Sequence, residues 1–275
     1  MVIRMDNRSI GVFDSGLGGL TTVKELQQLL PHENIVYFGD TARVPYGTRS
    51  REIITRYARQ DIRFLLTHDV KLIIIACGTV SSILTEELIS EQPVPIIRVL
   101  GPAAQAACAA NRKGDIAVIG TTATVRSGAY GKAIRAVNPT ARVIGKACPL
   151  FVPLVENGYI GRDNLVTQLV AKEYLNALKN EDIDTVILGC THYPLLYDVI
   201  GDVLGGDITL IDAGKETARY AAATLKSMGL VSESTGTGSA VFYVGDQPDD
   251  FAEIAARFLG ADIRENVNVV DIEKF

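Results

Sequence analysis

The 275-residue sequence lacks several features that would assign it directly to a common class of protein. It has no excess of basic residues, because 27 Lys and Arg stand against 32 Asp and Glu, which gives a formal net charge of -5. It has no apolar run of about 18 residues, the length that a membrane-spanning helix needs. The stretch Met1 to Ser9 contains no apolar segment of the kind that directs secretion. We therefore expect a cytoplasmic protein whose main partner is neither nucleic acid nor a membrane.

Motifs that bind common cofactors are also missing. The glycines in the segment DSGLGG, which begins at Asp14, do not keep the spacing of the dinucleotide-binding fingerprint. A phosphate-binding loop is excluded because Gly131-Lys132 is followed by Ala133. Pyridoxal phosphate is not expected either, because no Lys stands out at the end of an expected strand. We therefore expect a protein that works without a cofactor.

The sequence has four cysteines, at positions 77, 108, 148 and 190. In a chain of this length in a reducing compartment they need not form disulfides, so we expect four free thiols. Cys108 lies in the alanine-rich segment AAQAACAA, and we interpret it and Cys148 as small packed residues. Cys77 and Cys190 stand in a different context, described below.

Short apolar runs alternate with longer amphipathic segments along the whole chain. The segment Arg162 to Lys179 is typical of a helix, with Leu165, Leu169, Val170, Tyr174, Leu175 and Leu178 on the predicted apolar face and Asn164 and Thr167 on the polar one. The short runs predict buried strands at 9–13, 35–38, 72–76, 96–100, 116–119, 142–144, 186–188, 208–211 and 240–244.

This alternation predicts an α/β protein with mostly parallel sheets covered by helices on both faces. The length allows one large domain or two modest ones, and two smaller sheets suit the size at which single cores stop growing. The segment SESTGTG at 232–238 is expected to be a surface loop and not a linker between domains.

An internal echo supports two similar halves. The segment KLIIIACGTVSS at 71–82 and the segment DTVILGCTHYPL at 184–195 each contain an apolar strand, a small residue, a Cys and a polar turn that opens a helix. We therefore predict that Cys77 and Cys190 occupy the same topological place in two half-molecules.

Polar side chains follow many of the expected strands. Ligands bind beyond the carboxyl ends of parallel strands, so these residues predict one site. They are Asp14, Ser15, Asp40, Cys77, Thr79, Thr121, Thr124, Cys190, Thr191 and His192.

Two thiols that begin helices are candidates for acid-base chemistry. The N-terminus of a helix and a nearby base lower the pKa of a thiol, so we expect usable thiolates at Cys77 and Cys190. Pro194 fits the first turn of a helix, which predicts that Cys190 and His192 are displayed on a turn rather than packed in a core.

Other uses of these residues are weighed against this one. An isolated Cys usually packs as a small apolar residue, and an isolated His serves structure as often as function. A zinc site is disfavoured because Cys190 and His192 are separated by one residue and no second close pair completes a tetrahedron. The matched sequence context of Cys77 and Cys190 favours a catalytic role for both over a packing role.

Two thiols on opposite sides of one carbon suit the inversion of that carbon. One removes a proton from one face and the other returns a proton to the opposite face. The hydroxyls of Ser15, Thr79, Thr121, Thr124 and Thr191 suit a carboxylate, although the threonines are also typical helix caps. Asp14 or Asp40 suits an ammonium group.

The sequence resembles the glutamate racemase family of the aspartate/glutamate racemase superfamily. The resemblance runs along nearly the whole chain and is carried in order by four motifs: DSGLGG at 14–19, GDTARVPYG at 39–47, CGT at 77–79 and LGCTHYPL at 188–195.

The resemblance implies cofactor-independent interconversion of L- and D-glutamate, which supplies D-glutamate for bacterial peptidoglycan. It assigns Cys77 and Cys190 as the two acid-base groups, assisted by Asp14 and His192 respectively. It places Asp40 and Glu156 as acidic residues near the site. The positions it matches to substrate contacts are Asp14, Ser15, Pro45, Tyr46, Gly47, Gly78, Thr79, Thr121, Thr124, Thr191 and His192.

The resemblance also implies two α/β domains that face each other across the site. Mapped here they are residues 1–97 with 212–275, and residues 98–211. The family is often dimeric, which makes a homodimer an expectation. The family usually has Asn where this chain has Gly78, so a hydrogen bond to the substrate is lost, unless a backbone amide or water replaces it. Two alternatives stay open: the same chemistry on another substrate such as aspartate, and a non-catalytic binding or regulatory protein.

Overall fold

Two parallel β-sheets form the framework of the protein in the computed structural model, which describes residues 6–275. The first five residues of the N-terminal stretch considered above lie outside the described part. The six-stranded sheet has the order β10-β9-β2-β1-β3-β4, and the four-stranded sheet has the order β6-β5-β7-β8. The strands are β1 (Ser9–Asp14), β2 (Ile35–Gly39), β3 (Val70–Ile75), β4 (Ile96–Arg98), β5 (Asp115–Gly120), β6 (Arg142–Ala147), β7 (Ile183–Leu188), β8 (Thr209–Asp212), β9 (Ala240–Val244) and β10 (Val267–Val269).

The two sheets repeat one topology. The order β2-β1-β3-β4 in the first corresponds strand for strand to β6-β5-β7-β8 in the second, and all pairs are parallel. Cys77 follows β3 and Cys190 follows β7, the third strand of each series. The predicted fold class and the predicted equivalence of the two cysteines are confirmed.

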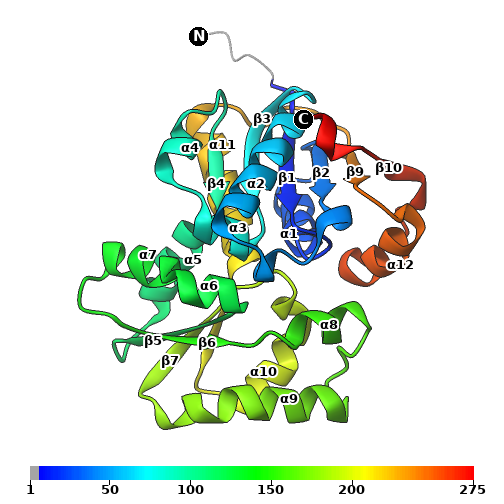
Figure 1. Cartoon of the computed structure of the whole chain (residues 1–275). Coiled ribbons are helices and arrows are strands. Elements are labelled where there is room, and N and C mark those ends of the chain that lie inside the picture. The colour runs from blue at the N-terminus through cyan, green and yellow to red at the C-terminus, as the bar shows by residue number, and fades with distance from the viewer. Residues whose placement is uncertain (1–5) are drawn as a thin grey trace.

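Helices cover both faces of each sheet (Figure 1). We call each sheet with its helices a lobe. On the six-stranded sheet, α1, α11 and α12 pack with Val12 on one face, and α2, α3 and α4 pack with Phe13 on the other. This follows the alternation of side chains along a strand. On the four-stranded sheet, α8, α9 and α10 cover one face, and α5 and α7 cover the other.

The helices have the following bounds. They are α1 (Leu20–Leu29), α2 (Arg51–Leu66), α3 (Gly78–Ile83), α4 (Glu86–Ser90), α5 (Leu100–Ala110), α6 (Thr122–Ser127), α7 (Ala129–Val137), α8 (Phe151–Glu156), α9 (Leu165–Leu175), α10 (Tyr197–Leu204), α11 (Ala213–Met228) and α12 (Pro248–Leu259). Short 3₁₀ turns are η1 (Thr41–Arg43), η2 (Tyr46–Thr48), η3 (Asn176–Asn180), η4 (Tyr193–Leu196), η5 (Arg264–Asn266) and η6 (Ile272–Lys274).

Side-chain caps define where several helices begin. The Ser50 hydroxyl accepts a hydrogen bond from the amide of Ile53 at the start of α2, and the Asp212 carboxylate accepts one from Lys215 at the start of α11. These oxygens satisfy amides that have no partner inside the helix.

Some predicted elements differ from the structure in extent. The expected strand 96–100 ends at Arg98, because α5 begins at Leu100. Strand β10 was not predicted, because its three residues are too short to show a period. The strand predicted at 142–144 extends to Ala147 and is only partly buried, since β6 lies at the edge of its sheet.

The predicted apolar face of the helix at 162–179 is confirmed at Leu175 and Leu178, which are buried, but is wrong in the first turns. The side chains of Leu165 and Leu169 are 65% and 57% exposed, whereas Thr167 is fully buried. Asn164 caps α9 by accepting from the amide of Thr167, whose hydroxyl in turn donates to the Tyr159 carbonyl at 2.7 Å. These bonds set the start of α9 and turn Thr167 inward.

The strands partition between the sheets nearly as the predicted domain division requires. Two boundary residues are exceptions. Arg98 was predicted in the second domain but belongs to β4 of the six-stranded sheet, and Asp212 was predicted in the first domain but belongs to β8 of the four-stranded sheet. The division itself stays a prediction. The segment 232–238 is a loop, as expected. Across residues 6–275, no helix combines the length and the apolar character needed to cross a membrane.

Candidate functional site

Four loops from the two sheets meet where the lobes face each other. The strand order reverses between β1 and β3 in the six-stranded sheet and between β5 and β7 in the four-stranded sheet. In parallel sheets, ligands bind in the crevice at such a switch point. The loops after β1 and β3 therefore face those after β5 and β7. These are the loops that contain Asp14, Cys77, Thr121 and Cys190.

Cys77 stands at the N-cap position of α3 and is buried. Its thiol donates a hydrogen bond to the hydroxyl of Ser15 at 3.4 Å. Burial, and after it the negative charge of Asp14, raise the pKa of Cys77 to about 12. The expectation that the helix N-terminus makes this thiol more acidic is therefore wrong, because desolvation and a like charge outweigh the backbone amides.

Asp14 ends β1 and is almost completely buried. One carboxylate oxygen, Oδ2, accepts a hydrogen bond from the amide of Gly16 at 3.2 Å, while Oδ1 is buried without a partner among the described residues. Burial raises the pKa of Asp14, and the positive charge of His192 opposes that rise. A buried carboxylate oxygen without a donor is costly, so this atom is suited to a positively charged ligand group.

Cys190, Thr191 and His192 lie in the turn between β7 and η4. The sulfur of Cys190 is 3.9 Å from Nδ1 of His192, whose Nε2 is 3.0 Å from Oε1 of Glu156 at the end of α8. The ring of Phe258, on α12, packs edge-on against the imidazole. Cys190 and His192 are thus on a turn, as predicted, but the turn is buried rather than displayed.

His192 is held in its charged form. Burial lowers its pKa, but the hydrogen bonds and charges of Cys190 and Glu156 prevail and raise the pKa of His192 to about 10. The arrangement of Cys190, His192 and Glu156 therefore resembles an activated thiol with an oriented partner.

Three threonine hydroxyls form a triangle across the two lobes. Thr79 Oγ1 is 3.0 Å from Thr121 Oγ1 and 3.5 Å from Thr124 Oγ1, and the last two are 3.0 Å apart. Thr121 also caps α6 by accepting from the Thr124 amide. Thr121 therefore both caps α6 and lies at the site.

Asp40 and Tyr46 bond to each other instead of pointing free toward a ligand. Asp40 Oδ2 accepts from the Tyr46 hydroxyl and from Nε of Arg43 at 2.7 Å. Arg43 also reaches Asp61 at 3.1 Å. The cluster is buried, and Asp40 Oδ1, like Oδ1 of Asp14, has no hydrogen-bond partner among the described residues. Asp40 supports the loop after β2, and its contact with an ammonium group stays a prediction.

The loop after β2 reaches the other lobe through Gly47. A β-carbon at this glycine would lie 3.7 Å from Cβ of Thr121. The loop also contains Pro45, which is exposed. Of the residues predicted at 45–47, Gly47 thus borders the Thr79, Thr121 and Thr124 triangle.

Several supporting residues were missed from the sequence. The hydroxyl of Thr21, on α1, donates to the Thr191 carbonyl at 3.2 Å, and the hydroxyl of Tyr37 donates to the Gly16 carbonyl at 2.7 Å. Arg43 lies inside a motif that carried the resemblance and was given no role there. No sequence motif marks Thr21 or Tyr37 as a supporting residue, because the carbonyls that they contact belong to other segments of the chain.

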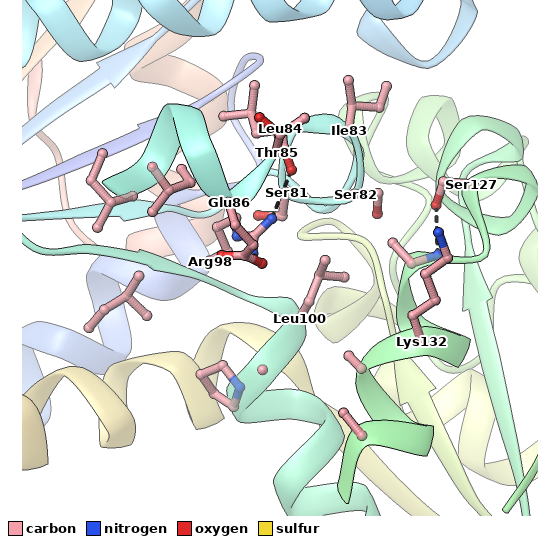
Figure 2. Close-up of a pocket in the computed structure, with 18 of the residues that line it drawn as sticks. Ser81, Ser82, Ile83, Leu84, Thr85, Glu86, Arg98, Leu100, Ser127 and Lys132 are labelled. Atoms are coloured by element: carbon pink, nitrogen blue, oxygen red, sulfur yellow. Dashed lines mark hydrogen bonds and ion pairs between the residues drawn. The ribbon is translucent and has the colours of Figure 1, made fainter. Parts of the chain in front are cut away.

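A large hollow beside α3 does not contain the thiols. A cavity of about 610 Å³ lies between α3, α4, α5 and α7 and is lined by Ser82, Arg98 and Lys132 among others (Figure 2). A hollow of only about 10 Å³ is bordered by Gly78, Gly189 and Cys190. The lobes are therefore closely apposed at the thiols. In the described part of the chain, no three His, Cys, Asp or Glu side chains gather in a way that would hold a metal ion.

These features define a class of protein: two like α/β lobes, each of which brings one cysteine to a shared crevice. Residues 17–221 match the family model described as Asp/Glu/Hydantoin racemase. The glutamate racemase of Geobacter metallireducens is 46% identical over 253 residues, covering 92% of this chain and 93% of that protein.

Solved structures agree with this class. The glutamate racemase of Bacillus anthracis matches with a TM-score of 0.92 and 37% identity, covering 97% of this chain and 98% of that one. That of Francisella tularensis in complex with D-glutamate matches with a TM-score of 0.89 and 38% identity, covering 98% and 100%. The chain belongs to the glutamate racemase family, which confirms the resemblance.

Proposed function

We propose that this protein interconverts L- and D-glutamate, with Cys77 and Cys190 as the two acid-base groups. The observation that carries the proposal is the placement of one thiol at the equivalent strand end of each lobe, with the two ends facing each other. Glutamate is the substrate named for the relatives that share this fold and much of this sequence. The product would serve peptidoglycan synthesis.

Each turnover moves two protons. One sulfur, as thiolate, removes the α-proton, and the electron pair of the C–H bond remains on the α-carbon and its carboxylate. The opposite thiol then donates its proton to the other face of that carbon. The two sulfurs exchange protonation states, and the reverse reaction uses them in opposite roles. Both proton transfers come from the chain itself, so the proposal gives no role to a cofactor.

Asp14 and the threonines account for substrate binding in this proposal. The unpartnered Oδ1 of Asp14 accepts from the α-ammonium group, while the hydroxyls of Thr79, Thr121 and Thr124 turn from each other to a carboxylate. The bound ammonium group neutralises the charge of Asp14, which is one cause of the raised pKa of Cys77. Substrate binding thereby makes the Cys77 thiolate easier to form.

The raised pKa of Cys77 makes its thiolate scarce at neutral pH in the empty site. A catalytic base works best when its pKa lies near the operating pH. The decrease in the pKa of Cys77 that substrate binding causes therefore favours proton removal.

The test uses Cys77→Ser and Cys190→Ser, with Cys108→Ser as the matched control. Cys108 is a half-buried thiol on α5 outside the site. Racemisation is followed by chiral chromatography in deuterated water with glutamate and, separately, aspartate. We expect each site variant to lose about 10²- to 10⁴-fold in rate and the control to lose little.

Three results would contradict the proposal. Full activity in either site variant would exclude the two-thiol mechanism. Deuterium at the α-carbon of aspartate but not of glutamate would show that aspartate is the substrate. No exchange with either amino acid would favour the non-catalytic alternative.

A further inference from the structure

The main chains of the two lobes touch at Gly78. A β-carbon at this position would lie 2.2 Å from the carbonyl oxygen of Gly189 and 3.3 Å from its carbonyl carbon. A β-carbon does not come within 3.0 Å of a neighbour unless something shifts, and here the neighbour is backbone rather than the tip of a flexible side chain. Gly78 directly follows Cys77, and Gly189 directly precedes Cys190. The contact therefore joins the two turns that carry the thiols.

A second glycine contacts the same turn from another loop. A β-carbon at Gly18, in the loop after β1, would lie 2.1 Å from Oγ1 of Thr191 and 2.6 Å from Nδ1 of His192. Thr21 ties this loop to the turn, because its hydroxyl lies within hydrogen-bond distance of the Gly18 and Thr191 carbonyls. The turn that carries Cys190 is thus seated on two glycines of the six-stranded lobe.

We propose that Gly78 is a positioning residue whose missing side chain sets how closely the Cys190 turn approaches Cys77. This inference rests on the proposed function. Proton transfer requires each sulfur to come within about 3 Å of its proton acceptor or donor, so the separation of the two turns controls whether both thiols reach one α-carbon. Ordinary contact with the Gly189 oxygen would require a β-carbon at position 78 to move back by about 1 Å.

The proposal differs from a simple loss of a substrate contact. The related family usually carries Asn at this position, so a missing hydrogen bond would be restored by Gly78→Asn, with a lower KM and a higher kcat/KM. A positioning role predicts the opposite. In this chain the Gly189 carbonyl lies where a β-carbon at position 78 would be, so any side chain there separates the thiols and lowers kcat, whether or not it is polar.

The experiment compares Gly78→Ala and Gly78→Asn with Gly206→Ala in the full-length protein. Gly206 is the matched control, because a β-carbon there meets nothing within 4 Å. The kcat and KM values are measured in both directions with glutamate. Deuterium uptake at the α-carbon is measured at the same time in D₂O, and thermal unfolding of each variant is recorded.

We expect both Gly78 variants to lose about 10²-fold in kcat, because a displacement of about 1 Å at reacting groups costs this much, while KM changes far less. One correctly placed thiol can still exchange the α-proton without inverting the carbon. The ratio of deuterium uptake to racemisation therefore rises, a change that lower stability alone would not produce. Gly206→Ala should match the wild type in all of these measurements.

Wild-type kcat in Gly78→Ala, or a higher kcat/KM in Gly78→Asn, would overturn the positioning role. If Gly78→Asn does not fold, Gly78→Ala decides, since alanine is compatible with the helical first turn of α3. Gly18→Ala adds an independent test, with a smaller expected decrease because its close neighbours are side chains. A wild-type protein inactive on glutamate would instead reject the proposed function.

Discussion

The charge pair between His192 and Glu156 predicts a specific change in the pH profile of Glu156→Gln. The two side chains lie 3.0 Å apart, and the pKa of His192 is raised to about 10 although its burial acts to lower it. Glutamine keeps the size and the hydrogen-bonding capacity of the side chain but removes its charge. The variant therefore isolates the electrostatic part of the contact.

The structure sets the expected magnitude. A carboxylate at this distance raises the pKa of a histidine by about one to three units. The Glu156 side chain is 38% exposed, so solvent screens the charge and we expect the lower end, about one unit. The pKa of His192 then falls from about 10 to about 9. The protonated fraction of His192 at pH 9 falls from about nine-tenths to one-half, whereas at pH 7.5 it stays close to one.

The assay compares kcat/KM of the wild type and Glu156→Gln between pH 7 and pH 10.5, with Glu233→Gln as the control. Glu233 is exposed in the loop at 232–238. We expect the ratio of wild type to variant to be close to one at pH 7.5, about two at pH 9, and larger above pH 10. Titration of the substrate cancels in this ratio, because both enzymes meet the same glutamate.

The same charge pair has two further measurable consequences, one for the reverse reaction and one for stability. L- and D-glutamate have equal free energies, so both directions must show the same change in kcat/KM. The raised pKa of His192 also stabilises the fold, fully below about pH 6.5 and no longer above about pH 10. Glu156→Gln should thus lower the free energy of unfolding by about 1 kcal/mol at pH 6 and by almost nothing at pH 10.5. A ratio that stays constant across the pH range would refute the reasoning.

Two further predictions concern buried charges outside the crevice. Lys71→Met removes the partner of the buried Glu33, 2.6 Å away, and should lower the free energy of unfolding by about 3 to 5 kcal/mol in urea titrations. A loss below about 1 kcal/mol would show that the pair is not desolvated. Arg43→Lys keeps a positive charge but loses the forked contacts with Asp40 and Asp61, so the loop after β2 loosens and KM should rise more than kcat falls. Steady-state kinetics with an unchanged KM would contradict this.

Much of the architecture is readable from local patterns. The run at 35–38 is buried on both faces, and the run at 240–244 is buried or half-buried throughout. Both runs are therefore apolar, and their strands could be located to within a residue. The echo between the segments around Cys77 and Cys190 also reflects a local requirement, since each strand must end in a turn that opens a helix.

Other features depend on contacts between distant segments. The orientation of the first turns of α9 could not be predicted from Leu165 and Leu169, because the cap at Asn164 and the bond from Thr167 to Tyr159 turn Thr167 inward. The strand order also depends on how whole sheets assemble. Neither of these is encoded in a periodic pattern.

The sequence by itself determined the class of fold, the two equivalent thiols and the family, because these depend on the order of residues along single strands and turns. Only the tertiary structure decided how the thiols behave. The pKa of Cys77 is raised rather than lowered, because burial and Asp14 act across space. Likewise, the absence of a side chain at Gly78 gains its meaning from Gly189, more than a hundred residues away in the chain and in direct contact in the fold.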